Sequence, residues 1–147
     1  MPLPEEPSRI LRERIKRHEG FSSDPYVDPL GHITIGYGHK VEPMSQYEAE
    51  QLLDVDLRQA RIQATSLFDK IWLGLNDTRR DVLTEMVFQM GKEGVSKFVK
   101  MRQALVNCDY ETAAKEMVNS RWYDQTQGRC RYLAYLMQTG QVLEKEG

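Results

Sequence analysis

The chain has 147 residues, of which 40% are hydrophobic and 29% charged, so it has the composition of a folded domain and not of a disordered chain. Its net charge of -2 gives no overall positive field, which argues against a nucleic-acid-binding protein but is compatible with a local basic patch. The two cysteines are too few for a disulfide framework and are typical of a reducing compartment.

The first predicted element is a helix over residues 8–18, where apolar side chains recur at helical spacing. Ser8 is a suitable N-cap for this helix. Gly20 follows its last turn, as glycine often does at the end of a helix.

The segment that follows has the composition of a turn and a strand. Asp28, Pro29 and Gly31 take the first, second and fourth positions of a type I turn. Residues 32–37 then alternate between two faces, with Thr34 on the face opposite the two isoleucines. A short hairpin is therefore predicted, and it is the only clear strand signal in the sequence.

From Ser45 onward the pattern is helical. Ser45 and Glu48 form a capping box that opens a helix toward Phe68, and Asn76 caps another helix, which Gly91 is expected to end. Shorter helices are predicted near residues 96–106, 110–118 and 127–138, with a break over residues 121–128.

This order of elements predicts an α+β fold in which a small hairpin lobe is joined by a long helix to a larger helical lobe. We expect the small lobe at about residues 20–45, the linking helix at about 45–66, and the helical lobe at about 70–140 together with the N-terminal helix. The predicted core side chains include Trp72, Met86, Met90 and Trp122.

Two carboxylates and a hydroxyl bracket the predicted hairpin. Glu19 ends the first helix, Asp28 begins the turn, and Thr34 lies on the returning strand. Asp28 and Thr34 have ordinary structural explanations, since aspartate suits a turn and threonine suits a strand. Glu19 is harder to explain, because the helix dipole disfavours an anion near a helix C-terminus.

Together these three groups suit glycoside hydrolysis. That reaction needs one carboxyl group to protonate the leaving oxygen and a second that stays ionised. Burial can raise the pKa of one carboxyl group while solvent keeps that of the other low. Glu19, packed against Phe21, is the candidate acid, and Asp28, on an exposed turn, is the candidate ionised group. Acid pairs around turns are common, so this pattern alone leaves other functions open.

The same residues resemble the motif of the bacteriophage T-even lysozyme family. The resemblance covers Glu19-Gly20, Asp28, Gly31 and Thr34-Ile-Gly-Tyr-Gly-His39, with the spacing of Glu, Asp and Thr unbroken. Further matching segments are Val87-Phe-Gln-Met-Gly91, Gly94-Val95, Asn119-Ser-Arg-Trp-Tyr-Asp-Gln-Thr126 and Gln138-Thr-Gly140. These segments are spread over almost the whole chain.

The resemblance implies the two-lobed phage lysozyme fold and hydrolysis of the β-1,4 bond between N-acetylmuramic acid and N-acetylglucosamine in peptidoglycan. It implies that Glu19 is the general acid, Asp28 the carboxylate supporting the positive sugar, and Thr34 the hydroxyl near the attacking water. It also implies inversion, which predicts carboxyl groups about 6.5–9.5 Å apart, with room for water between them.

Several substrate contacts are implied as well. The helix bearing Phe88 and Gln89 is expected to floor the cleft, and Gly38 to let the glycan approach the backbone closely. Arg121 either faces the catalytic edge or makes a structural contact with the adjacent tryptophan.

The chain also departs from the family's pattern. Met101 and Glu116 stand at two substrate positions where the T-even enzyme has polar side chains, so subsite affinity is expected to differ. The stretch between His39 and Ser45 is much shorter than in that enzyme, so part of the small lobe is missing. His39 and Asp54 match a family pair and are either an ion pair bracing the hairpin lobe against the long helix or two solvated side chains.

No cofactor or metal is expected, because the spacings of the three histidines fit no ligand motif. The expected partner is the glycan strand of peptidoglycan, bound by a monomer, with no nucleic acid and no membrane insertion. The start lacks the basic and apolar regions of a signal peptide, so we expect a bacteriolytic endolysin that waits in the host cytoplasm. A holin is then needed to release it to the periplasmic cell wall.

Two functions other than hydrolysis are compatible with such a fold. A lytic transglycosylase needs one acid and no group that aims a water, so Asp28 and Thr34 at the family spacing argue against it. A catalytically idle wall-binding domain would keep only the fold, and the intact set of three residues argues against that function. A reducing sugar end marks hydrolysis, whereas a 1,6-anhydro end marks transglycosylation.

Overall fold

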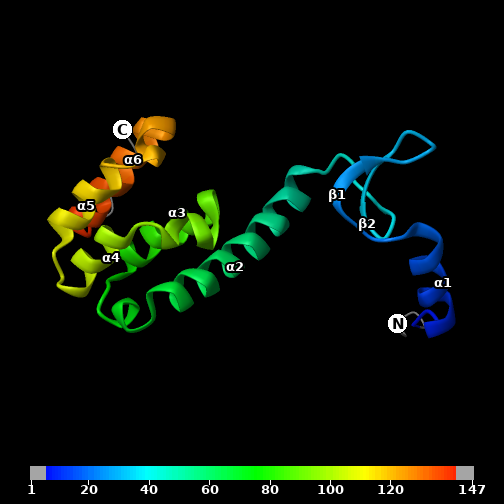
Figure 1. Cartoon of the computed structure of the whole chain (residues 1–147), viewed down its shortest axis with the longest axis horizontal. Coiled ribbons are helices and arrows are strands. Elements are labelled where there is room, and N and C mark those ends of the chain that lie inside the picture. The colour runs from blue at the N-terminus through cyan, green and yellow to red at the C-terminus, as the bar shows by residue number, and fades with distance from the viewer. Residues whose placement is uncertain (1–5, 142–147) are drawn as a thin grey trace. The chain divides into compact units, whose positions relative to one another are not determined.

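The computed structural model describes residues 6–141, which form helices and a small antiparallel sheet (Figure 1). The predicted α+β class is confirmed. The elements before residue 46 are α1 (Arg9–Glu19), β1 (Ser22–Val27), β2 (Ile33–Gly36) and β3 (His39–Lys40). The later elements are α2 (Gln46–Leu73), α3 (Asp77–Ser96), α4 (Val99–Val106), α5 (Tyr110–Val118) and α6 (Arg121–Thr139).

The chain forms two compact units, and the boundary between them in the sequence lies between Glu48 and Ala49. The first unit contains α1 and the sheet, and the second contains the helical part of the chain. α2 begins at Gln46, within the first unit, and continues into the second. One helix therefore crosses the boundary between the two units, and α1 belongs to the first unit and not to the helical one with which it was expected to group.

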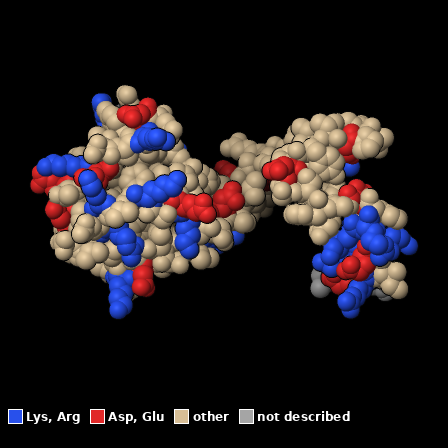
Figure 2. Space-filling view, viewed as in Figure 1, with Lys and Arg blue, Asp and Glu red and all other residues tan. Residues whose placement is uncertain are grey.

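Local hydrogen bonds start and end α1 as predicted. The Ser8 hydroxyl oxygen accepts a hydrogen bond from the N–H of Leu11 at 3.1 Å. Gly20 has φ +69°, and its N–H donates to the Lys16 carbonyl at 3.0 Å, which makes Glu19 the last helical residue. The helix carries five Lys or Arg against two Glu, and these cations gather over it in Figure 2. The net charge of -2 does not reveal this basic patch, because acidic residues elsewhere in the chain balance it.

The sheet has the strand order β1-β2-β3 with antiparallel neighbours. β1 and β2 form the predicted hairpin, and its turn is closed by the N–H of Gly31, which donates to the Asp28 carbonyl at 3.0 Å. β3 was not predicted, because a strand of two residues shows no periodicity. Thr34 pairs with Tyr26 on one side and with Lys40 on the other, so these three side chains share one face.

The capping box at the start of α2 is present. The N–H of Glu48 donates to the Ser45 hydroxyl at 3.1 Å, and the N–H of Ser45 donates to the Glu48 carboxylate at 3.3 Å. The helix runs to Leu73, and only Asp69 within it has a non-helical backbone, with φ +43°.

Two predicted helix boundaries differ from the structure. Gly91 leaves the helical region, with φ +78°, but helical structure resumes after it and α3 ends at Ser96. The predicted break over residues 121–128 is wrong, because Ser120 caps a helix there: its hydroxyl oxygen accepts from the N–H of Tyr123 at 3.3 Å. Only Thr126 interrupts that segment, with φ -139°.

The buried apolar side chains of the described residues all lie in the second unit. Trp72, Met86 and Trp122 belong to this core as predicted, whereas Met90 is only partly buried and packs against it. Among residues 6–48 the only buried side chain is that of Thr34. Within the described part of the chain, no helix is both long enough and apolar enough to cross a membrane.

Candidate functional site

Among the described residues of the first unit, the Asp28 side chain has the most hydrogen-bond and ion-pair partners. Its Oδ1 accepts from the backbone N–H of Leu30 at 3.0 Å and from that of His32 at 2.7 Å. Its Oδ2 lies 2.6 Å from Nζ of Lys40 and 3.4 Å from Nδ1 of His32. The prediction of an exposed carboxylate is therefore wrong, because these contacts leave the side chain only 10% exposed.

The charge state predicted for Asp28 nevertheless has a clear physical basis. The hydrogen bond from Lys40, and after it the backbone hydrogen bond from His32, hold the pKa of Asp28 well below its usual range. The same contact with Asp28 raises the pKa of Lys40. Asp28 is thus an ionised group because of its donors and not because of solvent. Lys40 was missed by sequence reasoning, since only the register of β3 brings it to Asp28.

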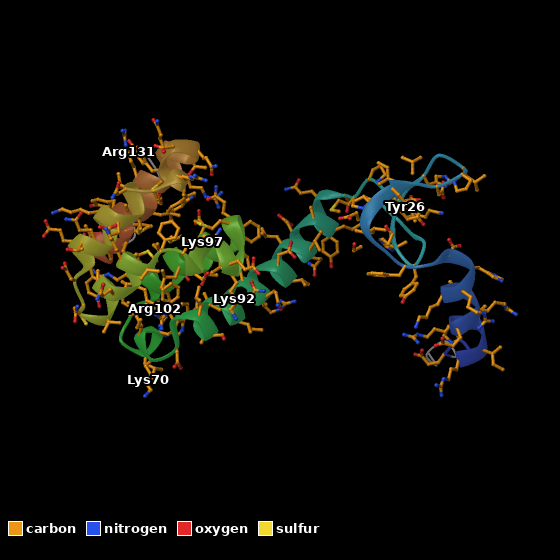
Figure 3. All side chains as sticks on the ribbon, viewed as in Figure 1. Tyr26, Lys70, Lys92, Lys97, Arg102 and Arg131 are labelled. Atoms are coloured by element: carbon orange, nitrogen blue, oxygen red, sulfur yellow. The ribbon has the colours of Figure 1, made fainter. Side chains whose placement is uncertain are left out.

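Thr34 lies at the centre of the same face. Its side chain is fully buried, because Tyr26 of β1 (Figure 3) and Lys40 of β3 flank it as cross-strand neighbours. The hydroxyl donates to the carbonyl of His32 at 2.9 Å. The hydroxyl oxygen can still accept a hydrogen bond from another group.

Glu19 lies at the C-terminal end of α1, as predicted, but not in a buried environment. The expected packing against Phe21 is wrong: Glu19 is exposed, and Phe21 is 69% exposed, with its ring centroid 5.5 Å from that of Tyr37. The reason is that Gly20 turns the chain directly after Glu19, and Phe21 pairs with the hairpin instead.

The neighbour of Glu19 is Gly38. A Cβ atom added at Gly38 would lie 2.8 Å from Cδ and 2.9 Å from Oε2 of Glu19. Gly38 also has φ +76°, a conformation that side chains disfavour. The structure therefore gives a reason for glycine at this position that does not involve the glycan.

In the second unit, α3 presents Phe88 and Gln89. Phe88 is 42% exposed, so its ring is available to a ligand. The side-chain oxygen of Gln89 accepts a hydrogen bond from Nε1 of the buried Trp122 at 2.8 Å. This bond between α3 and α6 fixes the orientation of the Gln89 amide.

A cavity of about 610 Å³ in the second unit brings together three predicted substrate residues, Met101, Glu116 and Arg121. No pattern in the sequence indicated that these three residues lie together. Lys97 (labelled in Figure 3) and Lys100 line the same cavity and were not predicted. The apolar lining comes from Met90, Phe98, Val99, Met101 and Trp122. Arg121 makes none of the cation–aromatic contacts found among residues 6–141, and its part in substrate binding stays a prediction.

His39 and Asp54 belong to different units. His39 is exposed on β3, and Asp54 is exposed on α2. The ion pair between them stays a prediction. In the described range, no three His, Cys, Asp or Glu side chains are grouped as metal ligands would be.

Comparison with known proteins identifies the family of the chain. The family model described as phage lysozyme matches residues 16–137. A probable T4-type lysozyme 2 of Dictyostelium discoideum is 30% identical over 91% of this chain and 96% of its own length. A probable T4-type lysozyme 1 of the same organism is 28% identical over 88% of this chain and 94% of its own length.

A third relative is larger. The pre-baseplate central spike protein Gp5 of Enterobacteria phage T4 is 31% identical over 97% of this chain, but the chain spans only 30% of that protein. The family match covers the last turn of α1, the sheet and nearly all of the helical unit. The chain therefore belongs to the phage lysozyme family, whose members are glycoside hydrolases that act on peptidoglycan.

Proposed function

We propose that the chain hydrolyses the β-1,4 bond between N-acetylmuramic acid and N-acetylglucosamine in peptidoglycan. The observation that supports this most is Asp28, an ionised carboxylate held by two backbone N–H groups and Lys40 at the family's motif position. A fixed negative charge is what an oxocarbenium-like transition state needs.

In the proposed reaction, Glu19 protonates the leaving glycosidic oxygen. Asp28 stabilises the positive charge that develops on the sugar, and the Thr34 oxygen accepts a hydrogen bond from the attacking water. The water attacks from the face opposite the leaving group and loses its proton to the ionised Asp28 carboxylate, so the product is inverted. This requires the carboxyl groups of Glu19 and Asp28 to stand about 6.5–9.5 Å apart.

We further propose that each unit has its own substrate contacts. In the first unit, the proposed contact with the glycan is the backbone of Gly38, which lies against the Glu19 carboxyl group. In the second, Phe88 offers an exposed ring and Gln89 an oriented amide. The cavity that includes Met101, Glu116 and Arg121 accepts substituents of the glycan strand.

The proposed biological role is that of an endolysin that lyses the host cell. By this proposal the enzyme is a monomer that waits in the cytoplasm, is released by a holin and cuts the periplasmic cell wall. The support is its membership of the phage lysozyme family and its match over nearly the full length of two T4-type lysozymes.

A turbidity assay on permeabilised Gram-negative cells tests the function. The wild type is compared with Glu19→Gln, which removes the proton but keeps the shape of the side chain. Clearing by the wild type and not by the variant supports catalysis, whereas equal behaviour of both refutes it and leaves a wall-binding domain.

Product analysis tests the bond and the mechanism. Reducing N-acetylmuramic acid ends are expected, and 1,6-anhydro ends would instead identify a lytic transglycosylase. NMR of the first product formed is expected to show the α-anomer, because inversion at a β-linkage gives that configuration. A β-anomer would refute inversion while leaving hydrolysis intact.

A further inference from the structure

Lys40 makes the one direct contact between a lysine or arginine side chain and Asp28 among the described residues. Nζ lies 2.6 Å from Oδ2 across twelve residues of sequence, a distance typical of a charge-assisted hydrogen bond. The register of β3 against β2 produces this contact, because it places Lys40 opposite Thr34 and on the same face. Lys40 thus comes from the strand that sequence patterns did not predict.

We propose that Lys40 is a positioning residue of the hydrolytic reaction, which fixes the orientation of the Asp28 carboxylate and supplies its counter-charge. This inference rests on the proposed function, in which Asp28 must stay ionised and aimed at the sugar. Lys40 itself is not required to touch the substrate.

The two oxygens of the Asp28 carboxylate have different hydrogen-bond donors. The two backbone donors, from Leu30 and His32, both bind Oδ1 and belong to the turn itself. They leave Oδ2 without a backbone partner. Lys40 binds Oδ2 at 2.6 Å, and the ring of His32 is more distant, at 3.4 Å. Lys40 is therefore the donor that keeps the carboxylate plane from turning about its bond to Cβ.

The charges around Asp28 support the same role. Its titratable neighbours are Lys40 on β3 and His32 in the turn. The Lys40 ammonium in turn interacts electrostatically with Glu19 at the end of α1 and with Tyr26 on β1. Two acidic groups in one site disfavour ionisation of each other, and a shared cation opposes that effect. Lys40 thus allows Asp28 to stay charged beside a second carboxyl group.

Lys40 is poorly suited to a purely structural role. Its side chain is 41% exposed, and exposed ion pairs contribute little to folding stability. Replacement of Lys40 is therefore expected to change the state of Asp28 and leave the fold intact.

The experiment uses Lys40→Met, which keeps the length of the side chain and removes the charge, and Lys40→Arg, which restores a cation. Lys115→Met is the matched control, because Lys115 forms an exposed pair with Glu111 in the second unit. The Asp28 carboxyl carbon is followed by NMR between pH 2 and 6, with Asp28→Asn used to assign its signal. Backbone amide spectra establish that each variant is folded at each pH.

In the wild type the Asp28 carboxylate is expected to stay ionised down to pH 2, whereas in Lys40→Met its titration is expected to move up into the measured range, with at least a tenfold rise in proton affinity. Lys40→Arg is expected to reverse most of this shift, and Lys115→Met to cause none. An acid limb of the kcat profile governed by Asp28 is expected to appear at higher pH in Lys40→Met than in the wild type, with KM changed less than kcat. These results would support the proposal.

Two results would overturn it. One is an Asp28 titration in Lys40→Met that matches the wild type, and the other is a shifted titration with kcat and its acid limb unchanged. A wild type without any glycan-cleaving activity refutes the proposed function, and with it the role of Lys40 in hydrolysis. The NMR titration is separate from activity, so it still establishes in that case whether Lys40 controls the charge of Asp28.

Discussion

The backbone of Gly38 lies against the carboxyl group of Glu19, with room for a hydrogen atom but not for a methyl group. An added Cβ would come within 2.8 Å of Cδ of Glu19, and the φ angle of +76° already favours glycine. Position 38 therefore limits where the proposed general acid can place its proton.

Replacement of Gly38 by alanine is expected to lower kcat/KM by about tenfold or more, because small displacements of a catalytic group are costly. The matched control is Gly36→Ala. Gly36 has a similar φ of +69°, but open space lies where its Cβ would stand. Both variants should lose about 1–2 kcal/mol of stability from backbone strain. Steady-state kinetics and chemical denaturation separate the two effects, and an equal loss of activity in both variants would contradict the role assigned to Gly38.

The ionised state of Asp28 predicts a specific dependence of stability on pH. Its pKa is lowered in the folded chain, so its contribution is complete above the unfolded-state pKa of about 4 and is lost as pH falls further. Melting temperatures measured from pH 6 to pH 2 should fall more steeply for the wild type than for Asp28→Asn. Asp81→Asn is the control, since that carboxylate is 73% exposed and pairs with Arg61. Parallel curves for the wild type and Asp28→Asn would show that the donors around Asp28 do not act as described.

The hydrogen bond from Trp122 to Gln89 predicts that a core residue affects activity. Trp122→Phe removes the indole N–H, so the Gln89 amide loses its fixed orientation, and kcat/KM is expected to fall several-fold. Trp72→Phe makes the same truncation at a site of similar burial, where the ring contacts Arg61 and Arg80. Both changes should cost about 1–3 kcal/mol. The assignment of Gln89 as a substrate contact fails if the two variants have the same kcat/KM.

The two methionines of α3 are expected to differ in their contribution to stability. Met86 is fully buried, so Met86→Ala should cost about 2–5 kcal/mol in the free energy of unfolding. Met90 is only partly buried and lines the cavity of the second unit, so Met90→Ala should cost less. Urea denaturation of both variants measures the difference. A larger loss for Met90→Ala would mean that the cavity is filled or closed in solution.

Much of the local structure could be predicted from the sequence. The caps at Ser8 and Ser45, the turn at Asp28 and the end of α1 at Gly20 all appear as expected. Each depends on hydrogen bonds between residues at most four positions apart, so side-chain type and spacing are sufficient to identify it. The positions of Glu19, Asp28 and Thr34 in the family motif are likewise a property of the linear chain.

The surroundings of those residues were decided by tertiary structure. The pairing of β3 with β2 gives Asp28 its lysine partner, and the bend after Gly20 leaves Glu19 exposed instead of packed on Phe21. The cavity that unites Met101 of α4 with Arg121 of α6 depends on how both helices pack against α5. These features join residues far apart in the chain through register and packing, and no local pattern of side chains specifies them. The sequence by itself therefore determined which groups carry the proposed chemistry, while only the folded structure decided which neighbours hold them and set their charge.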